Sequence, residues 1–314
     1  MMGRTKTMGT LKSSLLGAVL CLAFCTAFTL LGSGTVLGAS PPPSIRISVA
    51  YRELVVGEPV IVKVCLFNGG TDTVRAHAVF QPSWGLVDFQ VIDEDSSVFE
   101  YGKHKLVYTD WFHDPRLMDR LAPGDSLYGY VTLLYCVMRK PGTYNLIIYE
   151  PGTYWLRAVY HHWDIDVLSE PVEIHVSPTP SEELAARKLF LSKETLYFIG
   201  GDMESGANPA SWEAYHELVT NYPESVFAKY AWYYMARVDR WGHKYERAIE
   251  EYNYLLSHFE RFPYFEQAEI ELIELEVTRM GGEKERLLAL PEEYRRNVYL
   301  LRLLKRFGLV ECLK

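Results

Sequence analysis

The sequence has few cysteines, no long basic run, and no charged residue between Ser13 and Ser44. Five Cys in 314 residues are too few for a scaffold held together by disulfides. A net charge of -8 argues against nucleic acid as a partner, because such binding depends on neutralising phosphates. The motifs Gly-x-Ser-x-Gly and His-Glu-x-x-His and a phosphate-binding glycine loop are absent from the sequence. These absences predict a protein that is not an enzyme and uses no cofactor.

The first 39 residues have the pattern of a secretory signal peptide. Three basic residues and no acidic one stand in the first twelve positions, followed by an apolar stretch from Leu15 to Leu31 and then by small residues. Cleavage is expected after Ala39, with Gly38 as the second option. The alternative is an uncleaved membrane anchor, because ~20 apolar residues suffice to span a bilayer. The pattern predicts an exported protein that is periplasmic, exposed on the cell surface or secreted.

Residues 43–177 have the period-two pattern of β-strands. Val60, Val62, Val64 and Leu66 alternate with Ile61, Lys63 and Cys65, and similar short runs follow between turns rich in Gly and Pro. Seven or eight such strands without helical periodicity predict an antiparallel β-sandwich. The chain is therefore expected to be a multidomain β + α protein whose sandwich precedes an all-α module.

Two turn motifs add detail to this prediction. Pro151-Gly152-Thr153-Tyr154 places a Tyr at the start of a late strand, and Pro141-Gly142-Thr143-Tyr144 repeats the same residues. Together with the turn at residues 121–126 and the strand pattern at 169–176, these motifs resemble the final strands of bacterial extracellular immunoglobulin-like domains. The resemblance implies a Tyr hydroxyl bonded to upstream backbone, and either Tyr154 or Tyr144 could provide it.

Cys65 and Cys136 both fall in expected strands of this sandwich, and export would permit a disulfide between them. The alternation weakens that pairing, because Cys65 shares its parity with Lys63 and is expected to face away from the core. Cys21 and Cys25 lie in the signal segment, and Cys312 lies near the end of the chain.

A linker at residues 178–181 leads into a helical module at 182–314. Thr179 is the expected N-cap and Pro180 the expected first residue of a helix that would end at Gly200-Gly201. Beyond it, apolar residues recur with a period of about 3.6. Four further helices are expected. The first carries an apolar stripe from Phe227 to Val238 and ends at Trp241-Gly242, two more begin at Tyr245 and Pro263, and the last begins at Pro291.

The module contains an internal repeat. Residues 214–222 match residues 251–259 in their Tyr, Leu and aromatic positions after a shift of 37. With Tyr222-Pro223-Glu224-Ser225 and Tyr245-x-x-Ala248-Ile249, this segment resembles tetratricopeptide repeats of the kind found in outer-membrane assembly lipoproteins. The resemblance implies a protein-binding scaffold of the cell envelope. Fewer than the usual ~3 units are readable, so the terminal helices, the sandwich or a partner must cover the stack.

Aromatic residues supply the candidate binding sites. Helical repeats bind proteins through concave faces, so Tyr230, Trp232, Tyr233 and Tyr254 are predicted to anchor a protein partner. The alternative is a carbohydrate-binding surface module in which two sandwich residues, Trp111 and Trp163, stack on glycan. A metal site at residues 161–166 is disfavoured, because adjacent His161 and His162 would point to opposite faces of a strand.

Overall fold

The computed structural model describes residues 42–80, 82, 86–101, 118–137, 144–146, 148–162, 165–192, 194–195 and 209–310. The expected signal peptide, Trp111, Trp163, Cys312 and the side chains of Cys136 and Tyr144 lie outside the described part. Of the described residues, about 29% lie in strands and 40% in helices, so the mixed β + α class is confirmed.

Two sheets stack face to face in the first half of the chain. Strands β1 (Ser44–Val49), β3 (Val60–Phe67) and β8 (Ser126–Leu133) form an antiparallel three-stranded sheet. The larger sheet has six strands in the order β2-β13-β11-β5-β6, with β12 also pairing to β11. Its strands are β2 (Glu53–Val55), β5 (Val87–Ile92), β6 (Val98–Tyr101), β11 (Gly152–His162), β12 (Ile165–Leu168) and β13 (Val172–Ser177). Two further antiparallel pairs form separate two-stranded sheets, β4 (Val74–Ala76) with β7 (Asp119–Leu121) and β9 (Tyr135–Val137) with β10 (Tyr144–Leu146).

The alternating residues of the strands build the core between these sheets. Val62, Val64 and Leu66 of β3 are fully buried and meet Phe89 and Leu156 from the opposite sheet. The odd-numbered residues of β3 point the other way, as the alternation predicted. Cys65 among them is half-buried and carries a free thiol, so the structure contains no Cys65 disulfide.

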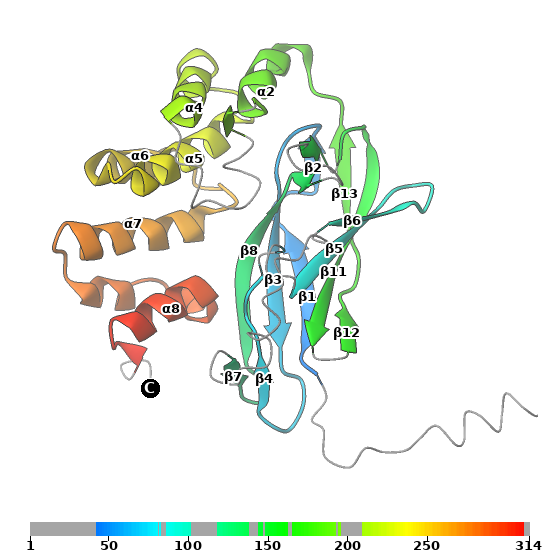
Figure 1. Cartoon of the computed structure of the whole chain (residues 1–314), viewed down its shortest axis with the longest axis vertical. Helices are drawn as coiled ribbons and strands as arrows, with labels where there is room; N and C mark the ends of the chain where they lie inside the picture. The colour runs from blue at the N-terminus through cyan, green and yellow to red at the C-terminus, as the bar shows by residue number, and fades with distance from the viewer. Residues whose placement is uncertain are drawn as a thin grey trace, which may run out of the picture. The chain divides into compact units, whose positions relative to one another are not determined.

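The helices follow one another in space as they do in sequence. They are α2 (Leu184–Phe190), α4 (Pro209–Asn221), α5 (Ala228–Trp241), α6 (Tyr245–His258), α7 (Phe265–Arg279) and α8 (Val298–Arg306). Each packs against its neighbour, and together they lie along the β1-β3-β8 sheet (Figure 1). Among the described helices, none is long and apolar enough to cross a bilayer.

Two helix starts differ from the expectation. The Thr179 hydroxyl caps no helix and instead donates to the Val56 carbonyl oxygen at 2.8 Å. The 3₁₀ turn Ser181–Glu183 and α2 follow, and α2 ends at Phe190, ten residues before Gly200. Pro291 opens a 3₁₀ turn, Glu292–Arg296, rather than the last helix. That helix is α8, whose N-cap Asn297 accepts from the Tyr299 N–H at 2.9 Å.

The sandwich covers the face of the helices that a short stack would otherwise expose. Tyr128 and Tyr130 of β8 each donate a 2.7 Å hydrogen bond to the Glu266 carboxylate on α7. Tyr230 of α5 donates to Glu58 Oε1 at 2.9 Å, next to the sandwich. Ile61 and Leu134 belong to the same buried cluster as the α4–α7 residues, and residues 41–314 form one compact unit.

Candidate functional site

The four aromatic residues predicted to bind a partner separate into two groups. Tyr230 and Tyr233 are 0% and 1% exposed, so the prediction is wrong for them. The central helix α5 is enclosed by α4, α6, α7 and the sandwich. The Tyr230 ring packs against Phe262, and the Tyr233 ring stacks on Tyr264. Residues of the sandwich, Ile61 and Leu134, belong to the same buried cluster and close the remaining side of α5.

Trp232 and Tyr254 lie together at the surface of the α5–α6 pair. Their ring centroids are 4.2 Å apart, and Tyr254 stacks in turn on His258 at 3.9 Å. Tyr254 is 39% exposed, whereas Trp232 is half-buried against the helical core. We call Trp232, Tyr254 and His258 the aromatic ladder. Flat rings already fixed by stacking lose little conformational entropy when a partner covers them.

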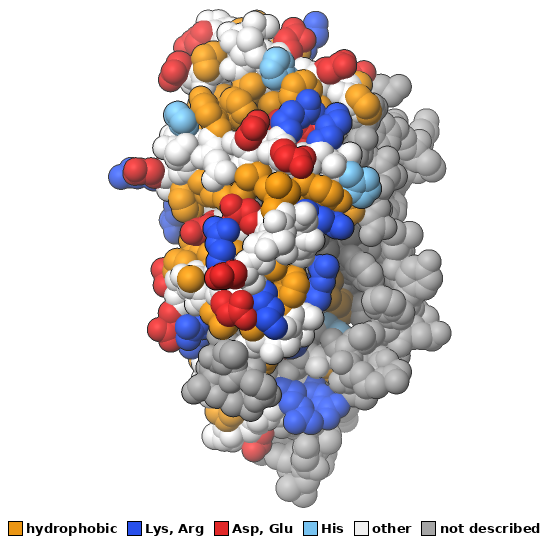
Figure 2. Space-filling view, turned by 90° about the vertical axis from the view of Figure 1, so that its left-hand side faces the viewer, with side chains coloured by type: hydrophobic (Ala, Val, Ile, Leu, Met, Phe, Trp, Pro, Cys, Tyr) orange, Lys and Arg blue, Asp and Glu red, His pale blue; other side chains and the backbone are white. Residues whose placement is uncertain are grey.

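A second stack lies between α4 and α6. The rings of Trp212 and His216 are 4.7 Å apart, and the Arg247 guanidinium sits 4.0 Å from the Trp212 ring centroid. Figure 2 looks onto the side of the molecule where the helices lie and shows hydrophobic side chains gathered among charged ones there. The exposed helical face therefore combines aromatic rings with both signs of charge.

Two buried carboxyl groups lie beneath this second stack. Asp239 is ion-paired to Arg247, and Glu251 Oε1 accepts a 2.9 Å hydrogen bond from the Trp212 indole. Glu251 Oε2 is buried and has no hydrogen-bond partner among the described residues. Burial, followed by the charge of Asp239, raises the pKa of Glu251 to about 8. Glu251 is therefore largely protonated at neutral pH.

This protonation predicts a pH effect on stability. The Glu251 pKa is higher in the folded chain than in the unfolded chain, so the folded state holds more protons across the interval from pH ~4.5 to ~8. The free energy of unfolding should fall as pH rises through that interval. Glu251→Gln keeps a Trp212 acceptor but cannot ionise. The measurement is urea unfolding at pH 5 and pH 9. The free energy of unfolding of the variant, relative to that of the wild type, should be higher at pH 9 than at pH 5 by on the order of 3 kcal/mol. An equal difference at both pH values would contradict this assignment.

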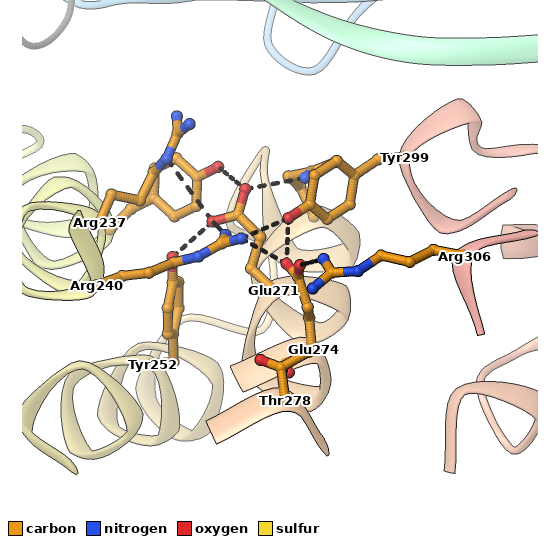
Figure 3. Close-up of polar contacts among 10 residues, drawn as sticks. Arg237, Arg240, Tyr252, Glu271, Glu274, Thr278, Tyr299 and Arg306 are labelled. Carbon is orange, nitrogen blue, oxygen red and sulfur yellow. Dashed lines mark hydrogen bonds and ion pairs between the residues drawn. The ribbon is translucent and has the colours of Figure 1, made fainter. Parts of the chain in front are cut away.

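A larger polar network ties α5 to α7 and α8 (Figure 3). Glu271 of α7 accepts from the Tyr252 hydroxyl at 2.5 Å and from Gln267 Nε2 at 2.9 Å, and Arg240 Nη1 lies 3.4 Å from its Oε2. Burial alone would raise the pKa of Glu271, but the Arg237 and Arg240 guanidinium groups outweigh it and hold the pKa below its ordinary value. Glu271 is therefore a buried, ionised carboxylate.

Glu274, one turn further along α7, connects the network to the last helix. It accepts from Arg240 Nη2 and the Tyr299 hydroxyl, and Arg306 Nη1 lies 3.3 Å from its other oxygen. Because every oxygen of the two glutamates has a donor, the network holds α5, α7 and α8 in fixed positions. The aromatic ladder, which starts on α5, therefore stands on a rigid support.

The remaining predicted sites are the glycan-binding alternative and the disfavoured metal site at residues 161–166. Trp111 and Trp163 lie outside the described residues. His161 does meet Asp166, Nδ1 to Oδ1 at 2.7 Å, while its Nε2 contacts Asp88 at 3.0 Å. Both ring nitrogens therefore already face carboxylates, the Asp88 contact chiefly raising the His161 pKa. Within the described segments, no group of three His, Cys, Asp or Glu side chains is arranged to hold a metal ion.

Sequence comparison identifies no family, and the similar solved structures named below are distant. No protein-family model matches the chain, and no curated protein matches it. One similar solved structure is the CARDB domain of the PF1109 protein from Pyrococcus furiosus in complex with di-metal ions. The two sequences are 11% identical, and the match covers 45% of this chain and 96% of that chain with a TM-score of 0.24.

Two others are larger proteins. Pseudomonas fluorescens alkylpurine DNA glycosylase AlkC, bound to DNA containing an abasic site analog, has 12% identity, 52% and 36% coverage and a TM-score of 0.25. Listeria innocua beta-glucosidase in complex with gluconolactone has 13% identity, 43% and 16% coverage and a TM-score of 0.22. The chain thus spans about a third and a sixth of these two proteins.

These two neighbours correct one expectation. The absence of catalytic motifs predicted that the protein is not an enzyme, and two of the three similar structures named above are enzymes. The prediction is therefore withdrawn. TM-scores of 0.25 and 0.22 are too low to assign either activity to this chain.

Proposed function

We propose that this chain is an exported scaffold protein of the cell envelope that binds a protein partner through its helical module, with the aromatic ladder as anchor. The observation that carries the proposal is the ladder itself. Two stacked aromatic rings and a histidine lie at the surface of a helix pair, above a saturated buried network. Rigid aromatic side chains of this kind dominate the binding energy of many protein interfaces.

The repeat seen in the sequence supports a tetratricopeptide-like module. A shift of 37 maps α4 onto α6 and α5 onto α7, and the paired positions share their burial. Tyr215 and Tyr252 are both fully buried, and so are Ala231 and Ala268. Two helix pairs with the same large and small residues at equivalent positions are what a repeat architecture requires. The sandwich takes the place of the next repeat.

The hydrogen bond of Tyr154 supports an immunoglobulin-like sandwich. Tyr154 stands near the start of β11 and donates to the Glu150 carbonyl oxygen at 2.9 Å. This contact has the form of the tyrosine corner of such sandwiches, where a Tyr hydroxyl is bonded to backbone a few residues upstream. The role we propose for the sandwich is to support and orient the helices.

The proposal predicts that binding depends on the ladder. Tyr254→Ala removes an exposed ring and its two stacking contacts, and should lower the capture of the partner from an envelope extract by about tenfold or more. The measurement is quantitative mass spectrometry of proteins retained by residues 40–314. The thermal midpoint should change little, because Tyr254 lies outside the core.

Trp241→Ala is the matched control. Trp241 is an exposed aromatic residue at the end of the same α5 helix, 37% exposed, and lies outside the ladder. Its replacement should leave capture unchanged. Capture that is insensitive to Tyr254→Ala, or lost equally in both variants, would refute the ladder as the binding surface.

A further inference from the structure

The outer faces of α4 and α6 carry more acidic than basic side chains. The two helices hold four exposed glutamates that make no ion pair within the part of the chain that the structure describes: Glu213 and Glu217 on α4, and Glu246 and Glu250 on α6. We call these four residues the acidic rows. Arg247 of α6 and Lys244 just before it both pair with the buried carboxylate of Asp239, so they do not neutralise the rows.

The glutamates of the acidic rows stand in like-charged pairs. Glu213 and Glu217 are four residues apart, as are Glu246 and Glu250, so the members of each pair are neighbours on the helix surface and repel each other. The helix dipole accounts only for Glu246, which lies in the first turn of α6. The other three therefore destabilise their helices, and an opposite charge brought by a partner would relieve this repulsion.

The spacing of the acidic rows fits an extended partner rather than an ion. Within the described segments, no three His, Cys, Asp or Glu side chains are arranged to hold a metal ion. Glutamates four residues apart stand about 6 Å apart along a helix axis. Alternate side chains of an extended peptide stand about 6.6 Å apart on one face of the strand. A peptide with a basic residue at every second position would therefore meet the glutamates of a row one for one.

The acidic rows adjoin the aromatic rings of the same surface. Glu250 lies one turn before Tyr254 on α6, and Tyr254 lies one turn before His258, so this row continues into the aromatic ladder. On α4 the glutamates directly follow the two members of the stack formed by Trp212 and His216. Arginine and lysine side chains cover rings with their aliphatic stems while their charged heads reach carboxylates, so rings beside carboxylates suit both parts of a basic side chain.

One arginine of the chain already binds in this way on the same surface. The Arg247 guanidinium lies 4.0 Å from the Trp212 ring centroid and donates from Nε and Nη2 to the Asp239 carboxylate. The acidic rows have no such arginine of their own. We propose, on the basis of the function proposed above, that the partner binds this surface through a basic segment whose arginine or lysine heads pair with the acidic rows and whose stems lie on the aromatic ladder.

The test is fluorescence anisotropy of a labelled Arg-Ala peptide of four repeats, titrated with residues 40–314. The matched probe replaces each arginine with citrulline, which keeps the shape of the side chain and removes its charge. Saturable binding of the arginine peptide is expected, with at least tenfold weaker binding of the citrulline peptide. The affinity should also fall when NaCl is raised from about 20 to about 200 mM, because salt screens exposed charges.

Two double variants separate the acidic rows from the net charge of the protein. Glu246→Gln with Glu250→Gln should weaken binding of the arginine peptide by about tenfold. Glu283→Gln with Glu285→Gln, two exposed glutamates at the 3₁₀ turn Lys284–Leu288, makes the same change of charge away from α4 and α6 and should leave the affinity unchanged. The inference is overturned if the citrulline peptide binds as tightly as the arginine peptide, if neither binds, or if both double variants weaken binding equally.

Capture of the partner from an envelope extract distinguishes this inference from the function on which it rests. Capture that is lost in Tyr254→Ala but retained in Glu246→Gln with Glu250→Gln would leave the ladder as the binding surface and refute the basic segment. Capture that is insensitive to Tyr254→Ala would refute the proposed function itself. Loss of capture in both variants, together with selective binding of the arginine peptide, is the expected result.

Discussion

Residues 180–314 expressed without the sandwich should fail to form a cooperatively folded module. The sandwich helps to bury α5, because Tyr230 donates to Glu58 and the Tyr234 hydroxyl lies 3.5 Å from Thr132 Oγ1. Ile61 and Leu134 of the sandwich belong to the helical core. Removing the sandwich would expose that core and leave Glu266 without both of its tyrosine donors. If the module is the repeat stack proposed above, its two helix pairs fall short of the number of units that a free stack needs.

The measurement is far-UV circular dichroism during thermal unfolding, with dye binding to exposed apolar surface as a second readout. Residues 40–314 should show one sharp transition. The fragment should show a broad, non-cooperative one with strong dye binding. A fragment that unfolds sharply, with a midpoint within a few degrees of the longer chain, would show that the shared core contributes little.

Part of the fold could be predicted from local patterns in the sequence. The alternation of β3 predicted which of its faces lies in the core and that Cys65 faces away from it. The 3.6-residue period predicted helices α5, α6 and α7. These features depend on which face of one element is apolar. The short strands β2, β4, β7 and β12 were missed, because three or four residues carry no readable period.

The burial of Tyr230 and Tyr233 could not be predicted in the same way. An aromatic residue on a helix is equally compatible with a core and with a binding surface, and the choice depends on what lies opposite. Here a sheet from the other half of the chain lies opposite, as the bond from Tyr230 to Glu58 shows. The mixed polarity of β8, with Tyr128, Tyr130 and Thr132 on one face, was the available signal for a covered sheet.

Glu271→Ala should destabilise the protein by about 3–5 kcal/mol, the range expected when one partner of a buried ion pair is removed. The substitution leaves two mostly buried guanidinium groups, those of Arg237 and Arg240, without this carboxylate, and it frees the Tyr252 hydroxyl in the core. Unfolding in urea at pH 7, with the slope and midpoint fitted together, measures the loss.

Glu276→Ala provides the comparison on the same helix. Glu276 pairs with Arg286 at 2.8 Å, but both side chains are partly exposed, so its removal should cost less than about 1 kcal/mol. Glu271→Gln refines the result, because it keeps acceptor capacity and loses only the charge. If the Gln variant is nearly as unstable as the Ala variant, the loss comes from the two uncompensated arginines rather than from the lost hydrogen bonds. A loss below 1 kcal/mol for Glu271→Ala would show that the network does not hold α5 to α7, and the rigid support assigned to the aromatic ladder would fall with it.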